Sequence, residues 1–297
     1  MTNMNTTVGS LSSGKGHRDE NFPVASYLIH SRHRRPILAF YRFARVADDV
    51  ADHPKLQAAE KLRVLDDMRR SLLDESDVAP DAVLLRSILR DRQLTAEHAL
   101  DLLEAFRRDV TRLRYETWDE LMDYCRYSAM PVGRFVLDVH GEAKSLWPAS
   151  DALCAALQIV NHLQDCGRDY RALDRVYIPQ AMLAAAGLTV DVLGADHASP
   201  ALMRVIESLA QNTGTLLAHA KPFSGQIFDF GLALEVSIIQ RLAEDLVRRL
   251  ISRDPLSERV HHRPAEALRL AAAAAMGFVA DRPRTRSARK SLAVSHR

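Results

Sequence analysis

The sequence predicts an all-α protein. Glycine accounts for only 12 of the 297 residues, which is about half of its usual share in globular proteins. Alanine, leucine and arginine are abundant, and all three favour helices. Apolar residues recur at i, i+3, i+4 and i+7 in several segments, which is the period of an amphipathic helix. No segment alternates apolar and polar residues for long enough to indicate a strand.

Helices can be placed along the chain by this period and by their start and stop signals. The apolar residues of segments 65–72, 202–209 and 239–246 each fall on one helical face. Thr117 and Glu120 have the spacing of a capping box, so a helix is expected to start there. Pro179 and Gly187 predict the ends of a helix that holds residues 182–186. We expect loops at residues 53–56, 76–82, 144–150 and 197–200.

The chain is expected to form one domain, over residues 21–280, because no linker and no internal repeat interrupts it. Residues 1–20 are polar and lack an apolar signal core, so they are interpreted as a disordered N-terminal arm. Residues 281–297 contain five arginines and one lysine against one acid. This basic tail is expected to be disordered. It would either attach loosely to an anionic membrane surface or only improve solubility.

Composition and missing motifs exclude several classes of protein. A net charge of +2 provides no global field for nucleic acid. The three cysteines show no CxxC spacing, which argues against a disulfide framework or a zinc site and favours a reducing cytoplasm. No apolar run approaches the ~20 residues of a membrane helix. The sequence has no GxGxxG, GxxxxGK[ST], GxSxG or HExxH motif, so a nucleotide-binding fold and a metalloprotease are unsupported.

A first acidic cluster lies near the N-terminus of the predicted domain. Tyr41, Arg45, Asp48 and Asp52 are spaced i, i+4, i+7 and i+11, which places them on one helical stripe, with Asp49 beside it. Carboxylates on adjacent turns repel one another unless a cation binds them, and such hard oxygen ligands suit Mg²⁺. The alternative is a solvated acidic face. It is disfavoured by the apolar residues that surround the acids, Ile37, Leu38, Phe40, Phe43, Val46 and Val50.

A second polar stripe has the same character. Gln158, Asn161, Asp165 and Asp169 fall at i, i+3, i+7 and i+11, and Arg168 lies where it could meet a phosphate. Alone, this stripe could equally be a polar helix face with buried amide hydrogen bonds. Two acidic helices facing each other across an apolar cavity would instead form a clamp for a diphosphate. Metal ions would then neutralise the leaving group, and no protein nucleophile would be needed.

At this point the chain resembles the squalene and phytoene synthase family over most of residues 21–280. The string Y-x-x-x-R-x-x-D-D-x-x-D at residues 41–52 is similar to that family's first aspartate-rich motif. The string Q-x-x-N-x-x-x-D-x-x-x-D at residues 158–169 is similar to the second, and RVYIP at residues 175–179 matches its usual continuation. YCRYSAMPVG, at residues 124–133, resembles the central helix that lines the substrate cavity. The resemblance implies an all-α isoprenoid synthase fold, with helices around a central hydrophobic cavity.

The resemblance also implies roles for individual residues. Those implied as Mg²⁺ ligands or their close support are Asp48, Asp49, Asp52, Asn161, Asp165 and Asp169. Those that would hold the diphosphate or orient the ligands are Tyr41, Arg45, Gln158, Arg175 and Tyr177. Those that would shape the prenyl channel are Tyr124, Ala129, Val132 and Gly133, for which plain core packing is the alternative. Further substrate contacts are implied for Asn21, Gln164 and Arg168.

Departures from the family pattern indicate a branch. Many members have Arg where this chain has Gln164, and Glu where it has Arg168, which could replace the missing contact. ENFPVAS at residues 20–26 and N-x-x-Q-D at residues 161–165 are similar to the hydroxysqualene synthases of bacterial hopanoid pathways. The resemblance implies ionisation of presqualene diphosphate and capture of the cation by water, without a nicotinamide cofactor. The alternatives are head-to-head condensation of two prenyl diphosphates and, from another class, a non-catalytic helical scaffold.

Overall fold

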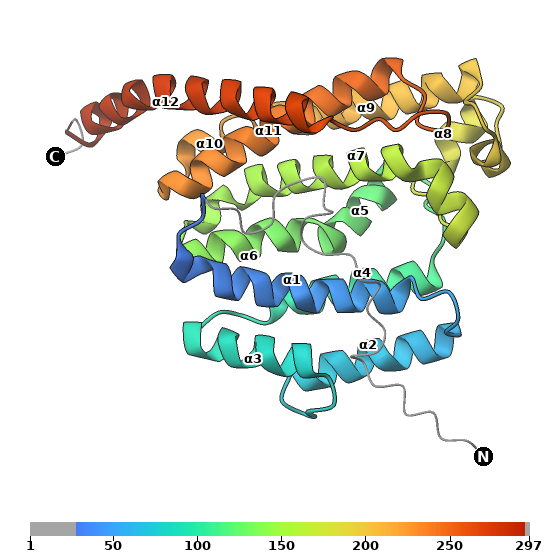
Figure 1. Ribbon diagram of the computed structural model, residues 1–297, viewed down its shortest axis with the longest axis horizontal. Coiled ribbons are helices and arrows are strands. Elements are labelled where there is room, and N and C mark those ends of the chain that lie inside the picture. The colour runs from blue at the N-terminus through green and yellow to red at the C-terminus, as the bar shows by residue number, and fades with distance from the viewer. Residues whose placement is uncertain (1–27, 295–297) are drawn as a thin grey trace.

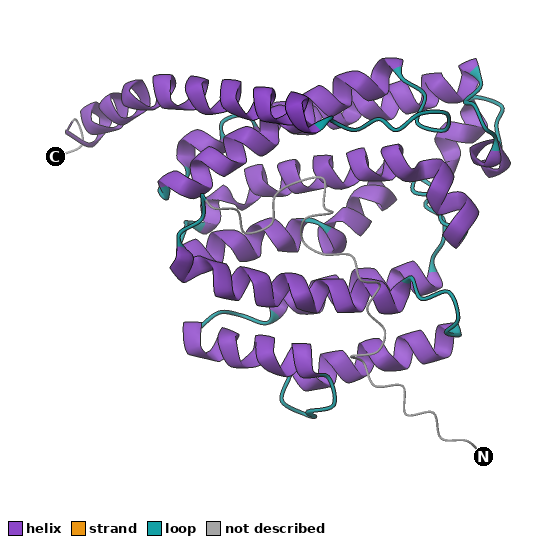
Figure 2. Ribbon diagram, in the orientation of Figure 1, coloured by secondary structure: helices purple, strands orange, loops and turns teal. Residues whose placement is uncertain are grey.

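The computed structural model describes the backbone of residues 28–294 and the side chains of residues 28–280. These residues form helices joined by loops, and Figure 2 shows no strand in this part of the chain. The expectation of an all-α protein is confirmed. The α-helices are α1 (Ser31–Ala51), α2 (Ala58–Leu72), α3 (Pro80–Arg92), α4 (Glu97–Thr111), α5 (Trp118–Ser128), α6 (Met130–His140), α7 (Trp147–Leu173), α8 (Gln180–Ala185), α9 (Pro200–Ala220), α10 (Phe223–Gln226), α11 (Phe230–Ser252) and α12 (Pro264–Val294).

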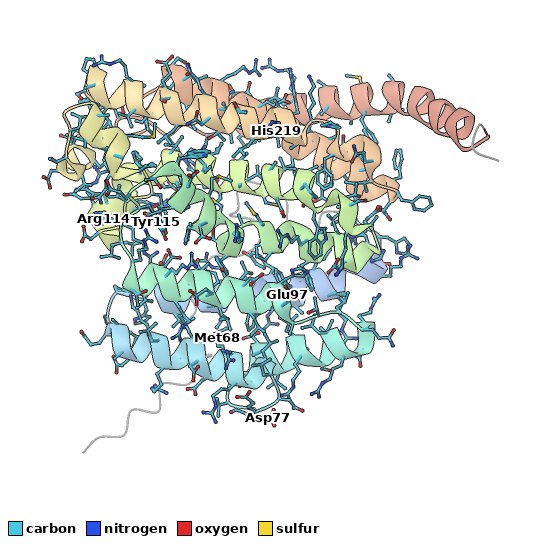
Figure 3. The ribbon with its side chains drawn as sticks, turned by 180° about the vertical axis from the view of Figure 1, so that it is seen from behind. Met68, Asp77, Glu97, Arg114, Tyr115 and His219 are labelled. Carbon is cyan, nitrogen blue, oxygen red and sulfur yellow. The ribbon has the colours of Figure 1, made fainter. Side chains whose placement is uncertain are left out.

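The helices stack in layers around two apolar cores (Figure 1). One core lies among α1, α2, α3 and α4 and is completed by residues of α6; it includes Phe43, Leu65 and Met68. Met68 is visible in the lower part of Figure 3. The other core joins α5, α7, α9 and α11 and includes Ile159 and Leu246. The long helices α1, α4, α7, α9 and α11 each bury an apolar face in one of these cores, as the periodicity of the sequence predicts.

Helix boundaries follow the local signals of the sequence. Thr117 precedes α5 and accepts a hydrogen bond from the backbone N–H of Glu120, as a capping residue should. Pro179 precedes α8, and Gly187 follows it with a φ of +70°, which favours glycine.

Pro36 lies inside α1 and cannot donate a backbone hydrogen bond. The Arg92 side chain donates to the carbonyl of Arg32, the group that the proline leaves without its helical partner.

The structure differs from the sequence prediction at several connections. The loop expected at residues 76–82 ends early, because α3 begins at Pro80. Residues 144–150 were expected to form a loop, but Lys144–Leu146 form a 3₁₀ helix and α7 begins at Trp147. Proline is well suited to the first turn of a helix, so Pro148 starts α7 rather than extending a loop. The central segment 124–133 is also divided between two helices. Ala129 separates α5 from α6 with φ −127° and ψ −47°, and Pro131 stands in the first turn of α6.

The chain termini fall partly outside the described residues. The expected arm at residues 1–20 and the predicted contact residue Asn21 lie outside them. At the other end the backbone of residues 281–294 continues α12 as a helix, whereas the sequence was expected to be disordered there. Arginine, which favours a helix, accounts for four of the fourteen residues of this segment. Among the described helices, none has an apolar stretch sufficient to cross a membrane.

Candidate functional site

The two acidic stripes line one polar cavity of about 420 Å³. Helix α1 contributes Asp48 and Asp52 from its last turns, and α7 contributes the whole second stripe. The members of the predicted site that line this cavity are Tyr41, Arg45, Asp48, Asp52, Tyr124, Gln158, Asn161, Asp165, Arg168, Asp169, Arg175 and Tyr177. Helical periodicity therefore brings together residues from two helices that are more than a hundred positions apart in the sequence.

A second, apolar cavity of about 290 Å³ adjoins the first. The two share Tyr41, Ala44 and Asn161 in their walls. Along α7, Leu153, Cys154 and Leu157 line only the apolar cavity, Asn161 lines both, and Gln158, His162, Asp165, Arg168 and Asp169 line only the polar one. A molecule with a charged head and a hydrocarbon body would fit this pair of cavities, because one half is polar and the other is lined by aliphatic and aromatic groups.

Arg45 organises the acidic end of α1. Its guanidinium lies 2.8 Å from Asp48 and 2.9 Å from Asp49. The Asp49 side chain is only 5% exposed and is not among the residues that line the polar cavity. Asp49 is rotated by about 100° from Asp48 on the helix, so its carboxylate is buried against Arg45. The geometry gives Asp49 a supporting position and leaves Asp48 and Asp52 facing the cavity.

The carboxylates in the polar cavity favour binding of a cation. Burial raises the pKa of Asp48 to about 7, with repulsion by Asp52 as the next cause. Burial also raises the pKa of Asp169 to about 6, and the nearby Asp165 adds to the shift. Carboxylates with raised pKa values are unfavourable as anions where they stand, and a divalent cation would remove that cost. The donor set of carboxylates and an amide oxygen therefore fits Mg²⁺.

One group of three possible metal-ligand side chains lies outside the two stripes. Within residues 28–280, three His, Cys, Asp or Glu ligand atoms lie within 4.8 Å of one another at His33, His140 and Asp229, and not at the stripes. The histidine cluster lies at the opposite end of α1, where the two rings stack at 4.1 Å and Arg32 donates to His33. A neighbouring guanidinium disfavours a cation in that cluster.

A hydrogen-bonded network beneath the acids was not predicted as such. The hydroxyls of Tyr124 and Tyr177 donate to the two oxygens of Asp109, at 3.0 Å and 2.8 Å. Burial raises the pKa of Asp109 to about 6, although Arg175 and both hydroxyls oppose that rise. Tyr124 was predicted to shape the apolar channel, but it lies on the polar side. The sequence contained Asp109, but its spacing from Tyr124 and Tyr177 carries no signal for this contact.

Arg175 connects the network to α1. Its guanidinium donates to the carboxylate of Asp52 at 2.6 Å and to the backbone carbonyls of Asp109 and Ala51. The loop that follows α7 is therefore tied to the last turn of α1. Arg114 forms an isolated β-bridge with Val176 of this loop, and Figure 3 labels Arg114 and Tyr115 at this end of the helical body.

Gln158 and His162 form a second pair on α7. The side-chain nitrogen of Gln158 lies 3.1 Å from Nε2 of His162. The His162 ring stacks on Tyr177 with centroids 3.5 Å apart. Burial, together with Arg175, lowers the pKa of His162 to about 3, so its imidazole is neutral at physiological pH. His162 was not predicted as a site residue, although its place four residues after Gln158 puts both on one helical face.

Two other predicted contacts differ in their surroundings. Arg168 pairs with Asp165 at 2.7 Å and approaches Asp169 at 3.6 Å, at the rim of the polar cavity. Gln164 is buried, does not line that cavity, and donates to the backbone carbonyl of Val260. The structure thus gives Gln164 a tertiary contact with the segment after α11. Sequence spacing could not reveal that contact, because Val260 is distant in the chain.

The predicted channel residues divide between wall and core. Val132 and Gly133 line the apolar cavity, whereas Ala129 is buried and lines neither cavity. A Cβ atom at Gly133 would stand 2.3 Å from Oγ of Ser150 and 2.6 Å from Sγ of Cys154. Glycine at this position therefore allows α6 to approach α7 closely.

Further residues line the polar cavity without having been predicted. They are Phe106, Asp109, Ser128, His162, Leu173, Arg259 and His261. Arg259 and His261 come from the segment between α11 and α12, which closes one side of the cavity. They belong to no periodic stripe, so only the folded chain brings them here.

A family model described as squalene/phytoene synthase matches residues 16–266 of the chain. Among curated proteins, the hydroxysqualene synthase of Rhodopseudomonas palustris is 58% identical over 88% of this chain and 89% of its own length. The hydroxysqualene synthase of Zymomonas mobilis is 57% identical over 91% of this chain and 92% of its own. Phytoene synthases also match, among them that of Enterobacter agglomerans, with 31% identity over 65% of this chain.

Solved structures resemble the whole helical body. A squalene synthase from Alicyclobacillus acidocaldarius superposes with a TM-score of 0.69 and 31% identity, covering 82% of this chain and 91% of that one. A dehydrosqualene synthase in complex with a ligand superposes with a TM-score of 0.74, over 92% of this chain and 97% of that one. Its identity of 21% supports the shared fold alone.

Proposed function

Because the chain belongs to the squalene/phytoene synthase family, and within it to the hydroxysqualene branch, we propose that it ionises presqualene diphosphate and adds water to give hydroxysqualene. The non-catalytic scaffold considered from the sequence no longer applies, since the chain is an enzyme of this family. The observation that carries the proposal is the junction of the two cavities. An acid-lined chamber and an apolar one share Tyr41, Ala44 and Asn161 in their walls.

The residues that would hold Mg²⁺ are Asp48 and Asp52 from α1 and Asn161, Asp165 and Asp169 from α7. All five line the polar cavity. When bound, the metal would supply positive charge that stabilises the departing diphosphate. Asp49 would act through Arg45, which it pairs with at 2.9 Å. Arg168 at the rim would meet the diphosphate oxygens.

The apolar cavity would hold the hydrocarbon of the substrate. Most of its wall residues, such as Phe40, Val132, Leu157 and Val236, offer no nucleophile to a carbocation, and Ser150, Cys154 and Glu235 are among the polar exceptions in the same wall. Exclusion of bulk water from this chamber would let the cation rearrange before it is captured. The net reaction is a substitution: a C–O bond to diphosphate breaks and a C–O bond to water forms. No reductant is required, so we expect no nicotinamide cofactor.

We further infer a cytoplasmic enzyme that contacts the membrane peripherally. The support is physical: the proposed substrate and product are hydrocarbons of low solubility, and the basic tail would favour an anionic surface. No nucleic acid is expected as a partner, given the net charge of +2.

The test supplies purified protein with Mg²⁺ and presqualene diphosphate in H₂¹⁸O, without a nicotinamide. Diphosphate release should accompany formation of a C30 alcohol that carries ¹⁸O. Removal of the metal with EDTA should stop both. Squalene formed only in the presence of NADPH would overturn the branch assignment. An inert presqualene diphosphate, together with condensation of two farnesyl diphosphates, would favour a condensing synthase instead.

A further inference from the structure

Ser128 ends α5 with a hydroxyl that has no partner. Its Oγ is shielded from solvent and makes no hydrogen bond to any described residue, although Ser128 lines the polar cavity. Buried hydroxyls in folded proteins almost always have a protein group or an ordered water as partner. An unsatisfied hydroxyl in a cavity wall therefore indicates that a small polar molecule belongs beside it.

The register of the helices places Ser128 opposite Gln158. On one side, the ring of Tyr124 lies 5.9 Å from that of His162. On the other, Gly133 of α6 packs against Cys154. The chain from α5 into α6 therefore runs antiparallel to α7. Ser128 is one turn past Tyr124, and Gln158 is one turn before His162, so the two stand at the same level of the cavity.

Gln158 is held in a fixed orientation. Its amide lies 3.1 Å from Nε2 of His162, and that imidazole is stacked on Tyr177. Whichever way the amide is turned, one hydrogen bond to His162 leaves further donor and acceptor capacity on Gln158. A water between Ser128 and Gln158 would thus have two polar partners in the wall of the polar cavity.

This level of α7 is also the junction of the two cavities. Leu157 lines the apolar chamber and Gln158 the polar one. We propose that Ser128 and Gln158 hold a single water at this junction, and that this water is the nucleophile that captures the carbocation. The inference rests on the proposed function and deepens it, because it names the group that decides between an alcohol and a hydrocarbon.

The step balances without any further reactant. A lone pair of the water oxygen forms the C–O bond to the carbocation, and the resulting oxonium loses one proton to the diphosphate that departed earlier. Substrate plus water therefore gives alcohol plus protonated diphosphate. Without the held water, the cation would lose a proton from a neighbouring carbon and give a C30 hydrocarbon with one more double bond.

The experiment compares Ser128→Ala, Ser128→Val and Ser128→Thr. Val and Thr have nearly the same shape and differ in the hydroxyl, so they form a matched pair. Each variant receives presqualene diphosphate and Mg²⁺, and both diphosphate and C30 products are quantified. The ratio of alcohol to hydrocarbon should fall by about 10-fold or more in the Ala and Val variants, and should stay within about 3-fold of wild type in Thr, on the scale of one lost hydrogen bond.

The outcomes separate this inference from the proposed function. A wild-type product ratio in both Ala and Val would overturn the role of Ser128. An equal loss in Thr and Val would also overturn it, because the hydroxyl would then not be the deciding group. Failure of the wild-type protein to form any alcohol would instead refute the proposed function. Helicity measured by circular dichroism identifies a variant that misfolds, and the remaining matched variants still decide the question.

Discussion

Asp48 and Asp165 occupy corresponding places on α1 and α7, each one turn before a second carboxylate that lines the polar cavity. We expect Asp48→Asn and Asp165→Asn each to lower turnover by at least ~10²-fold, because each removes a ligand charge that stabilises the departing diphosphate. The measurement is steady-state diphosphate release across a range of Mg²⁺ concentrations.

The matched control for these variants is Asp67→Asn. Asp67 is paired with Arg63 on α2, away from the cavity. This variant should keep nearly wild-type turnover, because exposed ion pairs contribute little. Normal turnover and normal Mg²⁺ dependence in either cavity variant would refute the metal clamp.

Asp48 should also make stability depend on pH. Its pKa is raised to about 7 in the folded protein, so between about pH 4 and pH 7 the native state keeps a proton that the unfolded chain has lost. The contribution of Asp48 to the free energy of unfolding therefore falls as pH rises through that window. Asp48→Asn cannot titrate and should be more stable than wild type at pH 8 in metal-free buffer.

The gain is expected to be ~1 kcal/mol, since solvent screens a side chain that is 35% exposed. Urea unfolding of wild type and Asp48→Asn at pH 5 and pH 8, with EDTA, measures it. Subtracting the free energy of unfolding of one protein from that of the other at each pH removes the contributions of the titrating groups that both proteins share. Added Mg²⁺ should shrink the difference at pH 8 by stabilising wild type. A difference that does not change with pH would count against this account.

Individual site residues were predictable where helical phase alone decides their position. Asp48, Asp52, Asn161, Asp165 and Asp169 share stripes in the sequence, and all line the polar cavity. Asp49 lies beside its stripe and Gln164 was implied by the family resemblance, but neither lines that cavity. One residue of shift along a helix turns a side chain by about 100°. Whether the rotated side chain then faces the core or the cavity depends on how the helices pack, which the spacing of residues in the sequence does not determine.

At the scale of elements, the approach of α6 to α7 depends on Gly133. We expect Gly133→Ala to destabilise the fold by ~1–3 kcal/mol, the usual cost of overpacking, because the new Cβ would stand 2.3 Å from Oγ of Ser150. Thermal or urea unfolding measures the change. Adding Ser150→Ala should recover part of the loss by removing the nearest clashing atom.

Gly214→Ala is the control for that substitution. Gly214 lies within α9, where a Cβ would meet Val247 at 3.8 Å, an ordinary contact. This variant should be stabilised by up to ~1 kcal/mol through helix propensity. Equal changes in the free energy of unfolding for Gly133→Ala and Gly214→Ala would show that the contact between α6 and α7 tolerates a Cβ atom at position 133.

Most helices were predictable from local signals, and the exceptions have local causes too. Thr117 caps α5, and Pro179 and Gly187 bound α8, as expected. The loop expected at residues 144–150 is helical because Pro148 suits a first helical turn. The division of the central segment at Ala129 was missed. Its sequence is apolar and helical on both sides, so the break reflects Pro131 and packing rather than composition.

At the scale of the whole molecule, α12 projects beyond the other helices (Figure 1). Its described part exposes Leu268, Met276 and Val279, and basic residues follow at 282–290. We expect a chain truncated after Ala280 to lose binding to anionic vesicles at low salt, because each basic residue near the surface contributes about 1 kcal/mol. Co-sedimentation with vesicles measures the binding.

Two controls sharpen that prediction. Neutral vesicles should bind the full chain and the truncated chain equally weakly. The full chain with Arg282→Gln, Arg284→Gln and Arg286→Gln should bind anionic vesicles at an intermediate level. If the truncated chain binds anionic vesicles as well as the full chain does, the tail does not attach the protein to membranes and only improves its solubility.

The architecture as a whole was accessible from the sequence, but the shape of its interior was not. Periodicity and low glycine content predict helices, and the acidic motifs led to the fold family. The volumes of the two cavities, and the segment at Arg259 and His261 that closes one of them, arise from contacts between distant residues. No pattern along the chain fixes such contacts, so cavity depth had to come from the structure.

The ion pair between Arg175 and Asp52 predicts that metal and substrate would each favour the binding of the other. In the ligand-free protein Arg175 holds Asp52 at 2.6 Å, so a cation must compete with a guanidinium for that carboxylate. A diphosphate that draws Arg175 away would release Asp52, and thermodynamic linkage then requires each ligand to raise the affinity of the other by one common factor.

We expect calorimetry to find tighter Mg²⁺ binding in the presence of an unreactive prenyl thiodiphosphate. That enhancement should shrink in Arg175→Gln, and an equal enhancement in both proteins would show that the coupling runs through other groups. Synergy of this kind would keep the clamp from closing on a metal alone, so that ionisation begins only when both charges are in place.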